Sequence, residues 1–287
     1  FCPKARRALR RRAPTVTMPL SIVRLRTMQE EEEMGMRAII IGAGRGHRLR
    51  PLTDDSHKSF TEIQGKRILD WILEAFADAG IDDVCFIEGF NGHVVRETYP
   101  QFTFRRNEDW ANNNILVSLM HAEDLMDRPF ITSYCDILYT PRLIRDLVNA
   151  SADIALGTDT DWVSHYQYRS QHPPSDAEKL TVKDGLVTRV GRTIDTADAY
   201  GEFVGVAKFS TDGARLFREH YHRCRERFSG REFREGRVFE DAMMIHLFDH
   251  MIDEGAAISH VDTHGHSREI DTHQDLELAN KYWRPPQ

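Results

Sequence analysis

The feature that most constrains the fold is a continuous apolar run, residues 38–41, that ends in a glycine-rich turn. A strand without polar alternation is typical of a central parallel strand covered on both faces. Strand-like and helix-like segments then alternate as far as about residue 157. The expected strands are residues 83–87, 130–134 and 154–156, and the expected helices are residues 68–76, 114–126 and 141–148. This alternation predicts an α/β fold with a doubly wound, mostly parallel central sheet.

The second half of the chain is richer in short strands. Asp184 and Gly185 form a turn signal between residues 178–182 and 186–190, which predicts a β-hairpin. Further strands are expected at residues 203–209, 258–261 and 268–270, and helices at residues 211–227 and 238–254. The sequence therefore predicts a single domain over residues 36–283, with a small β-rich subregion at about residues 158–210.

The N-terminal segment differs from the rest in charge. Residues 1–36 hold eight Lys/Arg and four Glu, although the whole chain has a net charge of −7. We interpret residues 1–35 as a disordered basic tail or as upstream sequence from a mis-assigned start, with an Arg-rich targeting peptide as the alternative. The remaining body is acidic, which argues against general binding to nucleic acid.

Cysteine usage and hydropathy indicate the cellular compartment expected for the chain. The four cysteines lie far apart without a Cys-x-x-Cys pair, which argues against a zinc site or a disulfide framework and favours a reducing cytoplasm. No stretch reaches the length of a membrane span, so no membrane partner is expected. A histidine cluster near the C-terminus is a minor zinc alternative; its members are His260, His264 and His266.

The glycine-rich turn is the strongest local signal. Gly42, Gly44 and Gly46 alternate directly after the first strand. Glycines let the backbone approach a phosphate closely, and exposed N–H groups then form an anion-binding nest. Basic residues lie near the turn in sequence: Arg45, Arg48 and Lys58. The spacing matches neither the Walker nor the dinucleotide pattern, so the turn alone indicates phosphate binding, with a plain structural turn as the alternative.

Residues 42–53 read Gly-Ala-Gly-Arg-Gly-His-Arg-Leu-Arg-Pro-Leu-Thr and are followed by Lys58. This segment resembles the signature of the nucleotidyltransferases that activate sugar 1-phosphates and phosphocholine. His57 stands where the family usually has Pro. The resemblance extends from residue 36 to about residue 283. It implies a Rossmann-like, GT-A-like nucleotidyltransferase fold and Mg²⁺-dependent transfer of a nucleotide to a phosphate or phosphonate oxygen, with release of pyrophosphate.

The resemblance also implies roles for individual residues. Lys58 would balance the triphosphate charge, and Arg45 and Arg48 would hold the leaving phosphates. Asp136 ends a strand, and Asp271 lies in a closing Glu-Ile-Asp-Thr segment; together they would hold Mg²⁺. The nucleotide would also contact the turn residues Gly42, Ala43, Gly44 and Gly46. The alternatives are a loop carboxylate for Asp136 and a helix N-cap for Asp271, with Thr272 as competitor.

The choice of base depends on a weaker match. Asn114 and Ser118 resemble the Asn-x-x-x-Ser-Leu segment of the phosphocholine and aminoalkylphosphonate cytidylyltransferase branch, which implies CTP. Val117 stands where that branch often has Tyr. Without the resemblance, an asparagine before a helix is simply a good N-cap.

The residues expected to bind the acceptor follow the strand expected at residues 154–156. Asp161 and Trp162 would supply a carboxylate and an aromatic face for an ammonium group, with a tryptophan packed on the sheet edge as the alternative. Lys179 would meet the acceptor phosphate or remain a surface lysine. Glu240 and Asp241 begin an expected helix that faces the pocket or solvent. Residues 170–175 are expected to form a mobile loop beside the site.

Three functions fit the sequence. The first is a cytidylyltransferase for phosphocholine or a small phosphonate such as 2-aminoethylphosphonate. The second is a sugar-1-phosphate nucleotidyltransferase that uses UTP, dTTP or GTP. The third is a non-catalytic nucleotide-binding regulatory protein. A glycosyltransferase is weaker, because residues 134–136 lack the first Asp of an Asp-x-Asp motif. The sequence leaves the oligomeric state open, with a homodimer as one option.

Overall fold

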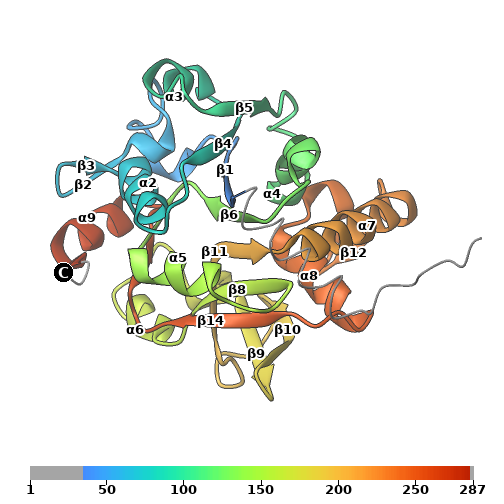
Figure 1. The fold of residues 1–287 in the computed structure, drawn as a ribbon. Helices are drawn as coiled ribbons and strands as arrows, with labels where there is room; N and C mark the ends of the chain where they lie inside the picture. The colour runs from blue at the N-terminus through green and yellow to red at the C-terminus, as the bar shows by residue number, and fades with distance from the viewer. Residues whose placement is uncertain (1–34, 285–287) are drawn as a thin grey trace, which may run out of the picture. The chain divides into compact units, whose positions relative to one another are not determined.

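The computed structural model describes residues 35–284 of the 287-residue chain, and it is built on a nine-stranded mixed sheet (Figure 1). The N-terminal tail expected over residues 1–35 lies outside the described residues, apart from Gly35. In spatial order the strands are β5 (Thr103–Arg106), β4 (Asp83–Glu88), β1 (Arg37–Gly42), β6 (Phe130–Tyr134), β11 (Gly201–Phe209), β8 (Ile154–Asp159), β14 (Ser259–Thr263), β10 (Leu186–Gly191) and β9 (Lys179–Lys183).

The direction of the strands changes at β11. The first four strands, β5 to β6, pair in parallel. Strand β11 is antiparallel to both of its neighbours, β6 and β8, and only the β8–β14 pair is again parallel in the second half of the described sheet. The prediction of a mostly parallel sheet is therefore right for the first half and wrong for the whole. The two neighbours of β11, β6 and β8, come much earlier in the chain, so the alternation of strands and helices along the sequence does not reveal its direction.

Helices pack on the sheet in two groups. The described α-helices are α2 (Ile68–Asp78), α3 (Gly92–Thr98), α4 (Ile115–Leu119), α5 (Pro141–Val148), α6 (Trp162–Tyr166), α7 (Thr211–Phe228), α8 (Met244–Asp253) and α9 (His273–Tyr282). Helix α2 packs against α5, and α7 packs against α8. Figure 1 shows these two pairs on opposite sides of the sheet. Helix α5 begins with Pro141, as the sequence predicts.

Two expected helices are shorter than predicted. The helix expected over residues 114–126 is α4 followed by the 3₁₀ segment Met120–Leu125, with non-helical backbone angles at Ala122. The helix expected from residue 238 begins only at Met244, after the 3₁₀ turn Phe239–Asp241. That turn is held by the start of α4, because Asn114 N donates to Glu240 O at 3.0 Å. Glu240 and Asp241 therefore do not begin a helix.

The predicted hairpin is present as β9–β10. Its turn residues Asp184 and Gly185 have φ of 53° and 78°, as a two-residue hairpin turn requires. Strand β10 also pairs with β14, and β9 with β11, so the expected β-rich subregion extends the main sheet. Three two-stranded ladders complete the described strands: β2 (Glu62–Ile63) with β3 (Lys66–Arg67), β7 (Ile137–Tyr139) with β15 (Ser267–Glu269), and β12 (Glu232–Arg234) with β13 (Arg237–Val238).

The core follows the apolar runs of the sequence. Residues 38–41 of β1 are at most 4% exposed. Three cysteines are buried and form no disulfide among the described residues: Cys85, Cys135 and Cys224. Within residues 35–284, no helix combines the length and the apolar character needed to cross a membrane.

Candidate active site

The glycine-rich turn leaves the end of β1 with little space around it. A Cβ at Gly42 would lie 2.2 Å from Cζ of Phe86 on the neighbouring strand β4, so only glycine fits there. Gly46 has φ of 65°, in the left-handed region that glycine adopts most easily. A Cβ at Gly44 would meet only Lys58 Nζ, at 3.9 Å. The turn therefore brings bare backbone close to the lysine.

His57 fixes the position of that lysine. Its Nε2 lies 2.7 Å from Gly42 O, and its Nδ1 lies 2.8 Å from Ser59 Oγ and accepts from Ser59 N at 3.2 Å. The ring thus joins the end of β1 to the 3₁₀ turn Lys58–Phe60. Burial lowers the pKa of His57 to about 4, against the carbonyl of Gly42, which raises it. His57 is therefore a neutral donor to Gly42 O, with the tautomer inferred from its partners.

Asp136 and Asp271 come together although they are far apart in the sequence. Asp136 lies between β6 and β7, at the carboxyl end of a strand beside β1. Strand β15 pairs antiparallel with β7, with Glu269 opposite Ile137, and Ile270 N donates to Asp136 O at 2.9 Å. This ladder delivers the two aspartates to the same edge of the sheet.

Each aspartate has a basic partner. Lys58 Nζ lies 2.5 Å from Asp136 Oδ2, and Arg48 forms an ion pair with Asp271. Burial alone would lower the pKa of Lys58, but the carboxylates of Asp136 and Asp271 raise it well above its ordinary value. Burial and the charge of Asp136 raise the pKa of Asp271. The four side chains therefore form an alternating set of charges beside the glycine-rich turn.

The two aspartates fit a hard divalent cation. Their carboxylate oxygens are the donors that Mg²⁺ prefers. Burial, followed by the charge of Asp136, raises the pKa of Asp271, so its charged form is disfavoured without a compensating cation. A cation there would release Lys58 and Arg48 to face phosphate oxygens.

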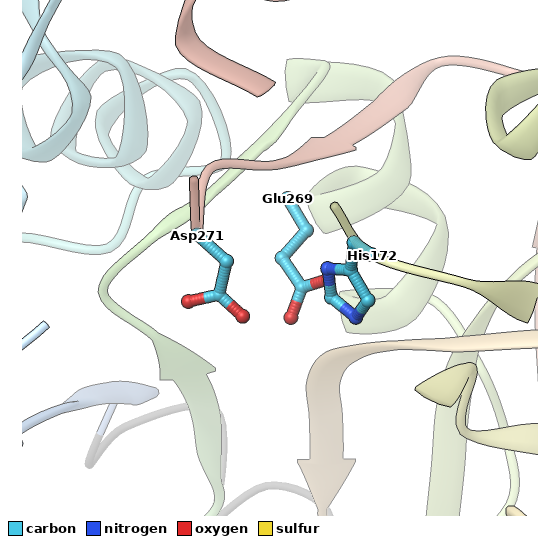
Figure 2. Close-up of side chains that lie close together, drawn as sticks. All are labelled: His172, Glu269 and Asp271. Atoms are coloured by element: carbon cyan, nitrogen blue, oxygen red, sulfur yellow. The ribbon is translucent and has the colours of Figure 1, made fainter. Parts of the chain in front are cut away.

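A second group near Asp271 includes a histidine. His172, Glu269 and Asp271 offer ligand atoms that all lie within 4.8 Å of one another, and Figure 2 shows them facing one space. Arg169 already contacts two of the three: Nη2 lies 2.5 Å from His172 Nδ1 and 3.3 Å from Glu269 Oε2. A guanidinium thus already supplies positive charge at this place, and an ion held by Asp136 and Asp271 stays a prediction.

The residues expected around the nucleotide lie in different settings. Arg45 pairs with Asp54 at 3.4 Å and lies over the ring of Phe90. Asn114 is the N-cap of α4, with its Oδ1 accepting from Ile115 N at 2.8 Å. Ser118 is buried and accepts from Asn107 Nδ2 at 2.9 Å. The N-cap alternative for Asn114 is therefore realised, and contact of Asn114 and Ser118 with a base stays a prediction.

The expected acceptor residues are not on the wall of the cavity that is described below for residues 35–284. Trp162 is 2% exposed and packs with Tyr166 and Ala177 in a small cluster of its own, so its ring offers no face to a ligand here. Asp161 bonds to Ser164 at the start of α6. Lys179 is not a surface lysine, because it is buried with its Nζ 3.3 Å from Pro174 O, and its contact with an acceptor phosphate stays a prediction.

The loop over residues 170–175 does lie beside the site. Its backbone N–H groups at Ser170 and Gln171 donate to Gln274 Oε1 at 2.7 and 3.1 Å, at the start of α9. The C-terminal histidines do not form a metal group among the described residues: His260 pairs with Asp262, and His264 with Thr160.

A cavity of about 490 Å³ lies beside the strand ends that carry the aspartates, although neither aspartate is part of its described wall. Its wall includes Tyr134 and Ile137, which flank Asp136 in the sequence, and Glu269, two residues before Asp271. Residues that the sequence did not single out also line it: Arg169, Glu178, Arg192 and Glu202. The position of Glu269 could have been predicted from the sequence, because it lies two residues before Asp271 and alternate residues of an extended chain share a face. The others come from separate segments, and no local sequence signal predicts them.

A glycine-rich turn at the carboxyl end of a parallel strand, beside the Lys58–Asp136 and Arg48–Asp271 pairs, is the arrangement expected of a nucleotidyltransferase. Residues 38–192 match the family described as the MobA-like NTP transferase domain, which covers more than half of the chain. The chain belongs to this family.

Three relatives show how far the likeness extends. The chain is 27% identical to a CTP:phosphoglutamine cytidylyltransferase from Campylobacter jejuni, over 85% of this chain and 98% of that one. It is 25% identical to a choline-phosphate cytidylyltransferase from Streptococcus pneumoniae, over 59% and 80%. The solved structure of the inositol-1-phosphate CTP transferase from T. maritima superposes with a TM-score of 0.65 at 20% identity, over 85% and 95%, and shows the same fold.

Proposed function

We propose that the protein transfers CMP from CTP to a small phosphate or phosphonate acceptor, with Mg²⁺ as the cation. The observation that carries the proposal is the meeting of the Lys58–Asp136 and Arg48–Asp271 pairs beside the glycine-rich turn. This arrangement suits displacement at phosphorus, in which the protein mainly positions and neutralises the reactants.

The reaction forms one bond and breaks one. An oxygen of the acceptor phosphate or phosphonate attacks the α-phosphorus of CTP, and the bond between that phosphorus and the bridging oxygen of pyrophosphate breaks. Mg²⁺, when held by Asp136 and Asp271, supplies charge neutralisation on the phosphate oxygens. Lys58 balances the charge that develops in the transition state, and Arg48, which is half exposed, holds the leaving pyrophosphate.

Of the two substrates, the identity of the nucleotide is better supported than that of the acceptor. The three relatives described above all carry CTP or cytidylyl transfer in their names. Their acceptors differ: phosphoglutamine, choline phosphate and inositol 1-phosphate. Phosphocholine and 2-aminoethylphosphonate are the acceptors suggested by the sequence, and a sugar 1-phosphate with UTP, dTTP or GTP is the alternative.

A pyrophosphate-release assay with Mg²⁺ tests the proposal. Four nucleoside triphosphates are crossed with phosphocholine, 2-aminoethylphosphonate and glucose 1-phosphate. We expect turnover with CTP and an amine-bearing acceptor. Turnover confined to glucose 1-phosphate would establish the alternative, and a preference for UTP, dTTP or GTP with every acceptor would overturn the assignment of CTP.

A further inference from the structure

The loop that ends at Lys58 is fastened from outside by an asparagine. Its second half, residues 51–57, carries the backbone from the glycine-rich turn to the lysine. Among residues 35–284, Asn91 is the residue outside the segment 42–60 that forms hydrogen bonds to this half. Its Nδ2 donates to Asp54 O at 3.1 Å and to Ser56 O at 3.2 Å. Both partners are carbonyl oxygens, which only accept, so the end of the amide that faces them is the NH₂ group.

Asn91 lies in the segment that connects β4 to α3, and this segment packs against the glycine-rich turn. Phe90 N donates to Ala43 O at 3.0 Å. A Cβ at Gly89 would lie 2.4 Å from the same oxygen, so the two backbones are in close contact. The two hydrogen bonds of Asn91 therefore start from a place that is itself fixed to the end of β1.

The side chain of Asn91 is not used in the way that is common at the start of a helix. Asn91 is the N-cap of α3, where an asparagine side chain usually accepts from a backbone N–H of the first turn. It makes no such bond here. Its φ of 50° and ψ of 20° lie in the left-handed region, which asparagine adopts more readily than most residues. Helix α3 thus begins without a side-chain cap, and the amide bonds to the loop instead.

The bond to Ser56 connects Asn91 to the charged site. Ser56 lies two residues before Lys58, and the ring of His57 between them bonds to Gly42 O. The backbone that leads into the lysine is therefore held from two directions, by β1 and by the segment between β4 and α3. Loss of the second hold would let the lysine leave the place where its charge faces a triphosphate.

We propose that Asn91 is a positioning residue for the transfer reaction, which holds residues 51–57 so that Lys58 faces the phosphates of the nucleotide. The inference rests on the proposed function, because that function assigns Lys58 to the triphosphate. Asn91 contacts the loop through its amide and acts through the lysine.

Two substitutions remove the donors and keep the backbone conformation. Asn91→Gly tolerates a positive φ and adds no charge, and Asn91→Asp keeps the shape of the side chain. The probe is inorganic tripolyphosphate with Mg²⁺ present, because its binding, measured by calorimetry, requires neither a base nor an acceptor. We expect both variants to bind tripolyphosphate about tenfold more weakly, because two hydrogen bonds to the loop are lost.

Asn149→Asp is the matched control. It makes the same chemical change at the exposed C-cap of α5 and should bind tripolyphosphate like the wild type. Wild-type affinity in both Asn91 variants overturns the inference.

A double-mutant cycle with Lys58 separates positioning from a general loss of stability. In a Lys58→Gln protein the group that Asn91 positions is absent. Adding Asn91→Gly to that protein should therefore weaken tripolyphosphate binding by less than about twofold. An equal, tenfold weakening in the two backgrounds overturns the inference.

Two further measurements decide the question if Lys58→Gln does not fold. Hydrogen exchange followed by mass spectrometry should become faster over residues 51–58 in Asn91→Gly and stay unchanged in α5. In pyrophosphate release, kcat/KM for CTP should fall by about tenfold, whereas KM for the acceptor should stay within about twofold. Unchanged exchange in the loop, or equal effects on the two substrates, contradicts the positioning role.

The results distinguish the inference from the proposed function. Coupling between Asn91 and Lys58 in tripolyphosphate binding supports the inference even if no acceptor is turned over, and absence of turnover then counts against CMP transfer alone. CMP transfer without this coupling leaves the proposed function standing and overturns the inference. A wild type that does not bind tripolyphosphate overturns the inference together with the role assigned to Lys58.

Discussion

At the scale of residues, a side chain at the site can also hold its charged neighbours in position. His57 replaces a proline expected from the family resemblance, and its ring holds the end of β1 against the turn that carries Lys58. Lys58 in turn pairs with Asp136, so one buried imidazole positions the basic half of the site. The charges are useful because their places are fixed before a substrate arrives.

Asp136→Asn should lower kcat for CMP transfer by roughly 10³-fold, because the buried carboxylate that faces Lys58 is lost without a change in shape. The measurement is pyrophosphate release, with circular dichroism and thermal unfolding to establish that the fold is intact. Asp146→Asn on the exposed side of α5 is the control and should keep the wild-type rate. A wild-type rate in Asp136→Asn would remove the role assigned to this residue.

The metal-free protein should lose stability in mild acid, in part through His57. Its pKa is lowered by burial from 6.5 to about 4, with Lys58 lowering it further and Asp136 opposing. The unfolded chain therefore binds more protons between these values, so this contribution to the free energy of unfolding is complete above pH 6.5 and falls by up to about 3 kcal/mol towards pH 4.

Urea unfolding at pH 7.5 and 5 measures this loss. His57→Gln keeps a donor for Gly42 O but does not titrate, so its stability should change less between the two pH values than that of the wild type. His165 and His172 also have pKa values lowered to about 4, and they are common to both proteins. Equal losses in the two proteins would show that His57 does not contribute.

At the scale of elements, the start of α9 holds the second aspartate. Asp275 Oδ2 accepts from Asp271 N at 3.2 Å and from Thr272 N at 2.9 Å, and Thr272 Oγ1 accepts from Asp275 N at 3.2 Å in a capping box. Arg169 fixes the other oxygen of Asp275. The N-cap role considered for Asp271 thus belongs to Thr272, which leaves the carboxylate of Asp271 free for Arg48 or a cation.

Arg169→Gln should weaken binding of a divalent cation by about tenfold or more, because the support of Asp275 and hence of Asp271 is loosened. Free Mn²⁺ measured by electron paramagnetic resonance reports the affinity without turnover. Arg142→Gln on α5, with a side chain that is 80% exposed, should bind Mn²⁺ like the wild type. Unchanged Mn²⁺ affinity in Arg169→Gln would contradict this positioning role.

Local signals predicted local structure well. The limits of α5 and the turn at Asp184–Gly185 depend on proline and glycine chemistry within a few residues. The antiparallel place of β11 depends on pairings with strands far away in the chain, and no pattern in its own residues reveals it.

The site residues also divide into those that local sequence signals predict and those that depend on contacts between distant segments. The turn, Lys58 and the two aspartates could be found because each adjoins a strand end or matches a motif. Trp162 was expected on the acceptor side, but whether an aromatic residue near a strand end faces a ligand or a core depends on what packs against it, here Tyr166 and Ala177. Arg192 directly follows β10 and Glu202 lies on β11, and only the folded sheet brings the two residues to one cavity.

Across the whole molecule, β11 joins the two halves of the sheet. Phe209 at its end stacks on Phe130 of β6 at a centroid distance of 4.6 Å and meets Phe217 of α7 and Phe248 of α8. One aromatic cluster therefore links the nucleotide-side strands to the C-terminal helices.

Phe209→Ala should lower the free energy of unfolding by about 3–5 kcal/mol, because a fully buried ring is lost from the junction of the two halves. Urea unfolding followed by tryptophan fluorescence measures the change. Val238→Ala is the control, since Val238 is 47% exposed, and it should change stability by no more than about 0.5 kcal/mol. A loss below about 1 kcal/mol in Phe209→Ala would contradict the bridging role of this ring.

The bond from Ile270 N to Asp136 O has a consequence for how the protein is made. Synthesis runs from the N-terminus, so a growing chain contains the glycine-rich turn, Lys58 and Asp136 long before it contains Asp271. Until β15 pairs with β7, the second carboxylate is missing and a nucleotide bound at the turn has no complete cation site. Under the proposed function, a chain interrupted before residue 271 would contain the turn but lack the second carboxylate of the proposed cation site, so transfer would become possible only after synthesis has reached β15.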